Sequence, residues 1–186
     1  MKTVVDVGDK RFELFIANEA INERTKQIGV ELNKEYRDRC PLFIGVLNGS
    51  FLFMADLLKE IKTDCEVGFI KVSSYTGTES TGKVKEVFGI STELKGRDIV
   101  IVEDIVDTGF TLKFLLEKLY EHQPASVVVC SLLYKPAALQ YNIIELKYTG
   151  FEISNDFVVG YGLDYNGLGR NLNDIYRIVP DNISLT

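Results

Sequence analysis

Three carboxylates follow closely after a short apolar run in the sequence, and this group is the part of the chain best suited to chemistry. The run is Ile99 to Val102, whose β-branched side chains predict a strand buried on both faces. Glu103, Asp104 and Asp107 follow it. Adjacent carboxylates repel each other, so the group indicates a site where a ligand offers hydroxyls, protons or a cation.

The residues directly behind the carboxylates suit an anion. They are Thr108, Gly109, Phe110 and Thr111, and they precede an amphipathic stretch, Leu112 to Tyr120, that predicts a helix. Two hydroxyls and several unpaired backbone N–H groups therefore gather at a helix N-terminus, where they can hold a phosphate. Carboxylates beside a phosphate site suit a ligand that carries both a diol and a phosphate, as a ribose 5-phosphate does.

The stretch from Val102 to Thr111 resembles the phosphoribosyl-pyrophosphate (PRPP) signature of the type I phosphoribosyltransferases. Three further segments resemble the hypoxanthine-guanine members of that family, in the same order. They are Leu42 to Ser50, the lysine after the strand Val127 to Leu133, and Phe157 to Tyr165. The resemblance covers roughly Leu42 to Arg170. It implies an α/β fold, a mostly parallel sheet flanked by helices, with a small hood over the base site.

The resemblance also implies how the chain is organised. We expect one phosphoribosyltransferase domain over residues 1–186, with a core of roughly 18–150 and a hood made from 1–17 and 151–186. The implied reaction is purine salvage, in which the 5-phosphoribosyl group of PRPP passes to N9 of a 6-oxopurine, giving IMP or GMP and pyrophosphate. A homodimer or homotetramer is implied as well.

The resemblance assigns roles to the residues that hold PRPP. Glu103 and Asp104 grip the ribose hydroxyls, Asp107 is the catalytic base that shares the purine proton, and the loop from Thr108 to Thr111 holds the 5-phosphate. Asn48, Gly49 and Arg170 bind pyrophosphate, and in the family the turn at Asn48 includes a non-proline cis peptide. Two positions depart from the common family pattern: Asn48 and Phe110 stand where many members have a cation.

Further roles concern the base, the metal and a flap. The residues assigned to the purine are Lys135, which donates to the 6-oxo group, Phe157, which stacks on the base, and Val158, which offers main-chain contacts. Mg²⁺ is the implied cofactor, held mainly by the substrate with help from Asp164 and from Glu103 and Asp104. Ser73, Ser74 and Tyr75 begin a flap that closes over the reacting centre.

The elements that must position these residues alternate along the chain. Apolar periodicity predicts helices at Glu19–Tyr36, Phe51–Ile61 and Leu112–Tyr120, and strands at Leu42–Val46, Val67–Val72, Val84–Ile90, Asp98–Val102, Ala125–Leu133 and near Val158 and Ile175, with a polar loop at Ser73–Lys83. This alternation predicts a parallel sheet with helices on both faces and ligands beyond the carboxyl ends of its strands.

Composition narrows the function classes. With 186 residues, 46% hydrophobic and 26% charged, the chain has the makeup of a globular domain. A net charge of −6 and a pI near 4.9 argue against a nucleic-acid surface. We expect no membrane span and a cytoplasmic location, because the longest uncharged stretch is too short for a bilayer and three widely spaced cysteines predict reduced thiols.

Several alternatives stay open or are set aside. Gly77 to Val84 fits a nucleotide-triphosphatase loop except at Val84, and its context predicts a strand rather than a helix. His122, the single histidine, is expected at a helix C-terminus and cannot support a catalytic triad or a zinc site alone. A transferase for xanthine or adenine, a non-catalytic PRPP-sensing regulator and a purely structural domain remain the competing hypotheses.

Overall fold

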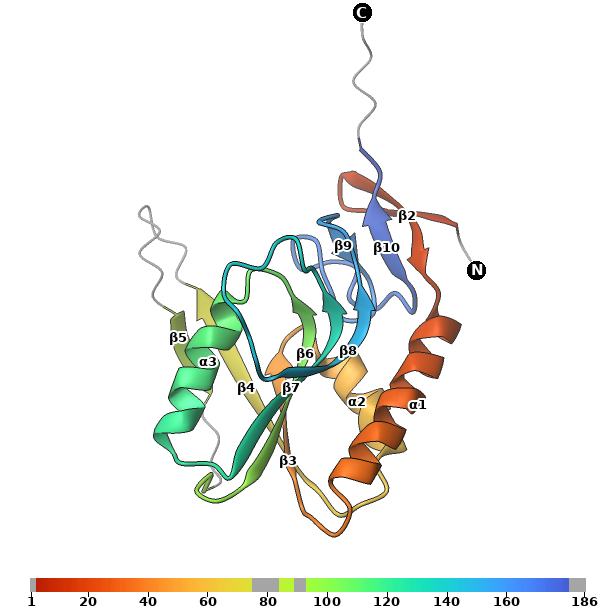
Figure 1. Ribbon diagram of the computed structural model, residues 1–186. Coiled ribbons are helices and arrows are strands. Elements are labelled where there is room, and N and C mark those ends of the chain that lie inside the picture. The colour runs from red at the N-terminus through yellow and green to blue at the C-terminus, as the bar shows by residue number, and fades with distance from the viewer. Residues whose placement is uncertain (1–2, 75–83, 89–92, 181–186) are drawn as a thin grey trace, which may run out of the picture.

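The structure is a computed structural model that describes residues 3–74, 84–88 and 93–180 (Figure 1). Its larger sheet has the order β5-β4-β3-β6-β7-β8. The strands of this sheet, in chain order, are β3 (Leu42–Leu47), β4 (Glu66–Ser74), β5 (Val84–Phe88), β6 (Asp98–Val106), β7 (Ser126–Tyr134) and β8 (Leu146–Glu152). All neighbouring strands pair in parallel except β5, which is antiparallel to β4. The predicted α/β class with a mostly parallel sheet is confirmed.

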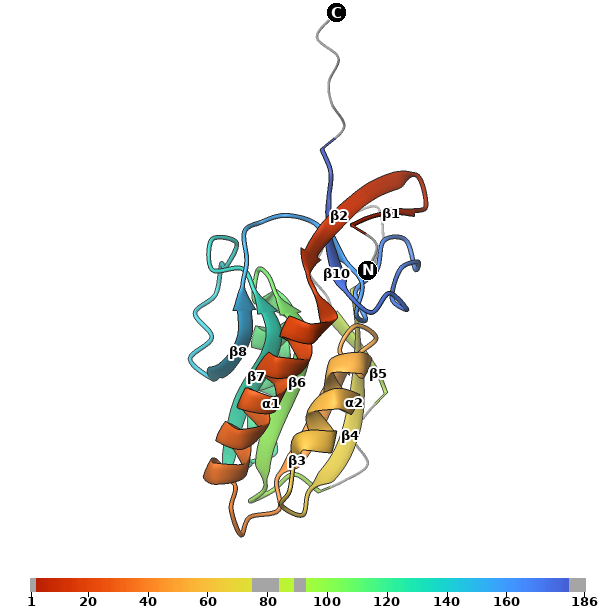
Figure 2. The ribbon, with the colours of Figure 1, turned by 90° about the vertical axis from the view of Figure 1, so that its right-hand side faces the viewer.

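Helices cover both faces of this sheet. α1 (Asn18–Glu35) and α2 (Phe51–Glu60) lie side by side on one face, and α3 (Phe110–Glu121) lies on the other (Figures 1 and 2). Strand β6 contributes side chains to the core on both faces of the sheet, because successive side chains of a strand point to opposite faces. Val100 and Val102 pack in the core under α1 and α2, whereas Ile99 and Ile101 pack in the core under α3.

A smaller sheet joins the two ends of the chain. Its order is β1-β2-β10-β9, and all its pairs are antiparallel. The strands are β1 (Val4–Val7), β2 (Lys10–Ile16), β9 (Val158–Val159) and β10 (Ile175–Ile178). This sheet stands beyond the end of the larger sheet where β6 and β7 finish, so residues from both chain ends lie above the same edge (Figure 1).

Some predicted element bounds are wrong. The signature strand continues to Val106, because its ladder with β7 runs through the pair Val106 and Tyr134. Glu103 and Asp104 therefore belong to the strand and do not follow it. Ser73 and Ser74, predicted in a loop, are the last residues of β4, which there pairs with β5. Tyr75 lies outside the described residues.

Three strands were not predicted. β1 and β2 belong to the segment that was expected in the hood, for which no element was predicted, and β8 falls in a stretch left unassigned. Val84 begins β5, so the sequence that fits a triphosphatase loop leads into a strand, as expected. His122 is the C-cap residue of α3, also as expected. Within the described residues, no helix is both long enough and apolar enough to span a membrane.

Candidate active site

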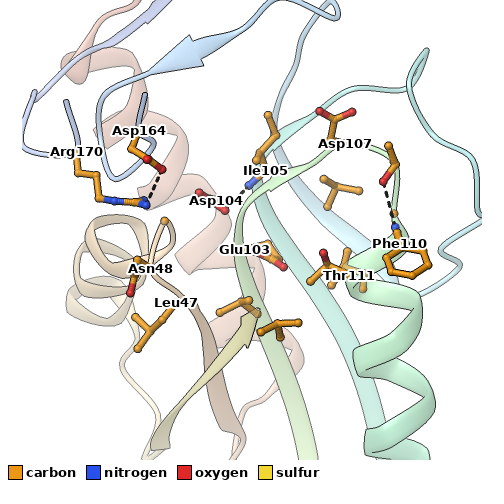
Figure 3. A pocket seen from close by; sticks show the side chains of 17 residues that line it. Leu47, Asn48, Glu103, Asp104, Ile105, Asp107, Phe110, Thr111, Asp164 and Arg170 are labelled. Carbon is orange, nitrogen blue, oxygen red and sulfur yellow. Dashed lines mark hydrogen bonds and ion pairs between the residues drawn. The ribbon is translucent and has the colours of Figure 1, made fainter. Parts of the chain in front are cut away.

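The predicted PRPP residues line one pocket at the carboxyl ends of β3 and β6 (Figure 3). Its volume of about 340 Å³ is in the range of small-molecule sites. The sequence-predicted residues that line it are Asn48, Gly49, Glu103, Asp104, Asp107, Thr108, Gly109, Phe110, Thr111, Asp164 and Arg170, and they are joined by apolar residues such as Val46, Val72 and Leu112. Parallel strands end at one edge of a sheet, which is why segments distant in sequence meet here.

The pocket lining has more acidic than basic side chains. Four carboxylates face one guanidinium, that of Arg170. In Figure 3, Glu103 and Asp104 occupy the middle of the pocket, with Asp164 and Arg170 on one side and Phe110 and Thr111 on the other. A ligand that spans the pocket therefore meets a cation at one end, carboxylates in the centre and a helix N-terminus at the far end.

Glu103 and Asp104 are held in place by the strand itself. Glu103 is only 5% exposed. Burial, with the Asp104 charge beside it, raises the pKa of Glu103 well above the ordinary range. Burial also raises the pKa of Asp104, although the backbone N–H of Ile105 donates to its Oδ1 over 3.0 Å. Two adjacent carboxyls shielded from water can donate a proton to a ligand or accept hydrogen bonds from its hydroxyl groups.

The turn after β3 approaches Asp104 closely. The Leu47–Asn48 peptide is cis, the geometry that the resemblance implied for this turn. A Cβ added at Gly49 would lie 1.5 Å from Oδ2 of Asp104, so a larger residue here would force the carboxylate out of its place. Asn48 is exposed, whereas Gly49 is buried. The turn and the carboxylates are therefore packed against each other without room for a side chain at Gly49.

The predicted phosphate loop has the form of an anion site. Gly109 is the N-cap of α3 and takes a left-handed φ of 80°, which favours glycine. The backbone N–H of Phe110 donates to Oγ1 of Thr108 over 3.4 Å. The helix begins at Phe110, so the first-turn N–H groups, including that of Thr111, point out of the helix start where they can bind an anion.

The structure pairs Lys135 with Asp107. Lys135 follows β7 directly and is 7% exposed, and its Nζ lies 3.1 Å from Oδ2 of Asp107. The sequence analysis had assigned both residues to the base but had not predicted this ion pair. A lysine ammonium has three N–H donors, so the contact with Asp107 leaves two for a ligand.

The segment after β9 closes the other side of the pocket. Nη2 of Arg170 lies 2.5 Å from Oδ1 of Asp164, and Nη1 donates to the carbonyl of Gly162 over 2.6 Å. The backbone N–H of Gly167 donates to Oδ2 of Asp164 over 2.7 Å. Asp164 is thus engaged on both oxygens within the protein.

None of the three predicted purine-binding residues lines this pocket. Phe157 is 44% exposed and makes an edge contact with Tyr165, at 5.9 Å between ring centroids. Val158 is buried and pairs through its strand with Arg177 of β10. Lys135 reaches the pocket only through Asp107. Lys135 therefore lies beside the pocket at Asp107, whereas Phe157 precedes β9 of the small sheet and Val158 begins it.

One residue close to the pocket escaped the sequence analysis. Gly162, at φ 100°, lies so near the pyrophosphate turn that an added Cβ would come within 2.0 Å of the Gly49 carbonyl oxygen. The alternation of glycine on either side of Tyr161 was the available signal, because glycine often marks a close backbone approach.

The carboxylates in the pocket suit a Mg²⁺ ion that is held largely by the bound ligand. Among the described residues, no group of three or more His, Cys, Asp or Glu side chains converges as a metal site. Asp104 and Asp164 nevertheless line the same pocket. Mg²⁺ commonly binds one or two carboxylates and completes its shell with water and substrate phosphates. This donor set fits a cation that arrives with a phosphate-bearing ligand.

Known proteins are similar to this chain over most of its length. Residues 16–166 match the family described as phosphoribosyl transferase domain. The hypoxanthine-guanine phosphoribosyltransferase of Lactococcus lactis is 47% identical over 177 residues, covering 93% of this chain and 94% of that protein. The protein of the same name from Bacillus subtilis is 45% identical, covering 90% of this chain and 93% of its own.

Solved structures agree with the sequence relatives. A hypoxanthine phosphoribosyltransferase from Staphylococcus aureus superposes with a TM-score of 0.85 at 41% identity, covering 90% of this chain and 91% of that one. A hypoxanthine-guanine phosphoribosyltransferase from Bacillus anthracis, with a HEPES molecule in its active site, gives a TM-score of 0.84 at 36% identity. It covers 94% of this chain and 99% of its own.

Proposed function

The chain belongs to the hypoxanthine-guanine phosphoribosyltransferases. From this premise we propose which residues of its pocket bind each part of the two substrates. The enzyme carries out purine salvage, transferring the phosphoribosyl group of PRPP to hypoxanthine or guanine. The observation that carries the proposal is the order of groups across one pocket: a guanidinium, one buried and one half-buried carboxyl, and a helix N-terminus.

That order matches the order of groups in PRPP. The pyrophosphate lies at the turn of Asn48 and Gly49 with Arg170, the ribose hydroxyls lie on Glu103 and Asp104, and the 5-phosphate lies on the loop that runs from Thr108 through Gly109 and Phe110 to Thr111. Backbone N–H groups make most of the contacts to the 5-phosphate and share the pyrophosphate with Arg170, because neither Asn48 nor Phe110 supplies a charge.

The carboxylates also serve the reacting centre. Breaking the bond between C1 and pyrophosphate builds positive charge on the ribose ring, and this charge favours the ionised form of the Glu103 and Asp104 carboxyls beside it. Two carboxylates this close to each other repel unless they share a proton. Hydrogen bonds from the hydroxyl groups of a ligand relieve this repulsion. The ribose diol offers two such donors.

The purine lies between Asp107 and the small sheet. The Lys135 ammonium keeps one donor on Asp107 and gives another to the 6-oxo group. Asp107 is the catalytic base: its carboxylate, half exposed beside Lys135, accepts the proton that the base loses as N9 attacks. Phe157 stacks on the ring, since part of its face is accessible, and Val158 contributes main-chain contacts.

Mg²⁺ bound with the substrate would make pyrophosphate a better leaving group by neutralising its charge. Asp164 is the side chain we assign to it, with Asp104 and Glu103 nearby. Ser73 and Ser74 follow Val72, a pocket residue, and together with Tyr75 they remain our proposal for a flap that excludes water. We likewise keep 18–150 as the core and 1–17 with 151–186 as the hood.

A panel of free purines tests the proposal. Purified protein is mixed with PRPP and Mg²⁺ and offered hypoxanthine, guanine, xanthine and adenine in turn, with nucleotide formation measured by absorbance or chromatography. We expect turnover of hypoxanthine and guanine and rejection of adenine. A preference for xanthine would move the specificity to the contacts around C2, and PRPP binding without any turnover would support a regulator of the same fold.

We also propose a homo-oligomer in the cytoplasm. Val67 and Phe69, two positions apart on β4 and therefore on one face of the strand, are 48% and 43% exposed, and an exposed apolar pair on one face suits an interface. A homodimer or homotetramer is expected in light scattering, and a monomer at micromolar concentration would refute it. The three free cysteines, Cys40, Cys65 and Cys130, suit a reducing compartment.

A further inference from the structure

A buried tyrosine ties the segment after β9 to helix α2. The hydroxyl of Tyr161 donates a hydrogen bond to Oδ2 of Asp56 over 2.7 Å, across 105 residues of sequence. Tyr161 is 2% exposed, whereas the side chain of Asp56 is 30% exposed. Oδ1 of Asp56 accepts a second hydrogen bond, from Nζ of Lys59 over 2.7 Å. The aspartate therefore keeps contact with solvent while it holds a buried phenol.

The backbone at Tyr161 is unusual for a residue with a side chain. Its φ is 48°, in the left-handed region, between Gly160 at 102° and Gly162 at 100°. For an L-residue other than Gly, Asn or Asp this conformation costs about 1–2 kcal/mol and persists only where surrounding contacts hold it. The contacts here are the bond to Asp56 and the backbone hydrogen bond from Tyr161 N to Leu172 O, over 2.8 Å.

Each side of this contact leads to a different part of the pocket. Asp56 is on α2, the helix that starts two residues after Gly49 of the pyrophosphate turn. Tyr161 stands between Phe157 and Asp164, residues assigned to the base and to Mg²⁺. Its neighbour Gly162 lies directly against the Gly49 carbonyl and accepts the hydrogen bond from Arg170.

We infer that Tyr161 is a positioning residue whose hydrogen bond to Asp56 sets the purine-binding segment against the pyrophosphate turn. The inference deepens the proposed function and rests on it. The two substrates must meet with N9 aligned to C1, and a shift of about 1 Å between their binding segments can cost 100-fold in rate. The Tyr161–Asp56 bond is a side-chain hydrogen bond that joins those segments away from the reacting atoms.

Conservative variants on both sides of the bond test this role. Tyr161→Phe keeps the ring and its packing but removes the donor. Asp56→Ala removes the acceptor, and Asp56→Asn retains an oxygen that can accept. Lys59→Ala is the matched control, because it removes the other partner of Asp56 and leaves the tyrosine contact intact. For each protein, kcat and the KM values for hypoxanthine and PRPP are measured together with the unfolding temperature.

We expect Tyr161→Phe and Asp56→Ala each to lower kcat/KM for hypoxanthine about 10-fold, which is within the 100-fold that a shift of about 1 Å between the binding segments can cost. The double variant should lose little more than either single one, because both remove the same contact. Asp56→Asn should recover most of the loss, and Lys59→Ala should match the parent.

Two outcomes would overturn the inference. If Tyr161→Phe lowers the unfolding temperature but leaves both KM values and kcat unchanged, the bond is only structural. If Lys59→Ala lowers kcat/KM as much as Asp56→Ala, the effect belongs to the charge on α2 and not to the tyrosine. If Tyr161→Phe does not fold, the comparison of Asp56→Ala with Asp56→Asn still tests whether the hydrogen bond positions the purine-binding segment. Failure of the parent protein to use any 6-oxopurine would instead refute the proposed function.

Discussion

Replacing Lys135 by methionine tests the assignment of the base site most directly. The lysine is buried, and its Nζ lies 3.1 Å from Asp107 Oδ2. Methionine has a similar length and fills the space with apolar atoms, so the substitution removes the charge and the donors while it preserves most of the packing. The Asp107 side chain is 47% exposed and remains hydrated when its partner is gone.

The structure separates the expected effect on stability from that on catalysis. Because the aspartate is half exposed, losing the ion pair should change the free energy of unfolding by less than about 1 kcal/mol. Losing one charge-assisted hydrogen bond to the 6-oxo group costs about 1.5–3 kcal/mol, and each 1.36 kcal/mol is tenfold in rate. The kcat/KM for hypoxanthine should therefore fall by roughly 10- to 150-fold.

The assay compares two bases in two proteins. An ammonium cannot donate to the amino group of adenine, which is itself a donor at that position, so adenine is a poor substrate of the parent and should lose little in Lys135→Met. The discrimination between hypoxanthine and adenine should shrink accordingly. Lys147→Met is the matched control: Lys147 is an exposed lysine that also forms an ion pair, 2.6 Å from Glu35, outside the pocket.

Three results would refute this reasoning. Equal use of adenine and hypoxanthine by the parent would remove the need for a donor at the 6-position. Equal losses for both bases in Lys135→Met would mean that the lysine acts through Asp107 or through stability. A comparable loss in Lys147→Met would show that the effect is not specific to the pocket.

Three other predictions concern the carboxylates and the metal. Asp107→Asn should lower kcat by roughly 10²–10⁴ with little change in the KM for PRPP, and a kcat like that of the parent would exclude it as the base. Glu103→Gln should weaken PRPP binding and yet stabilise the ligand-free protein. A carboxyl whose pKa is raised by folding stabilises the folded state at low pH, and this contribution is lost as the pH rises from about 4.5 through the raised value. The variant's advantage in thermal unfolding should therefore grow with pH above about 4.5, and a constant or falling advantage would contradict the assigned burial. Excess chelator should abolish turnover, with recovery on adding Mg²⁺, but should leave the unfolding temperature unchanged, because the described residues form no metal site of their own.

Short-range patterns in the sequence determined the centre of the fold. The residues from Ile99 to Val102 were predicted to be buried on both faces, and each of them is 0% exposed. The apolar positions of α3 follow a helical period, and the buried ones are Leu112, Leu115, Leu116 and Leu119. Such patterns are readable because strand and helix geometry bring residues two, three or four apart onto one face, whatever the rest of the chain does.

The limits of the elements depended on distant partners. β6 continues to Val106 because β7 continues beside it, and no residue in the signature itself indicates this extension. β2 was missed although it pairs with the adjacent β1, and its other partner, β10, lies more than 150 residues away through registers such as Phe12 with Ile178. A strand of this kind is stabilised by its neighbours and by burial more than by its own propensity.

The site divides in the same way between sequence and structure. The residue types and their order along the chain were enough to identify the carboxylates, the phosphate loop and the family. The pairing of Lys135 with Asp107, 28 residues apart, and that of Tyr161 with Asp56, 105 apart, came only from the folded chain. So did the burial that raises the pKa of Glu103. The free energies of charges and hydrogen bonds depend on which groups surround them and on how much water is excluded, and the packing of distant segments decides both.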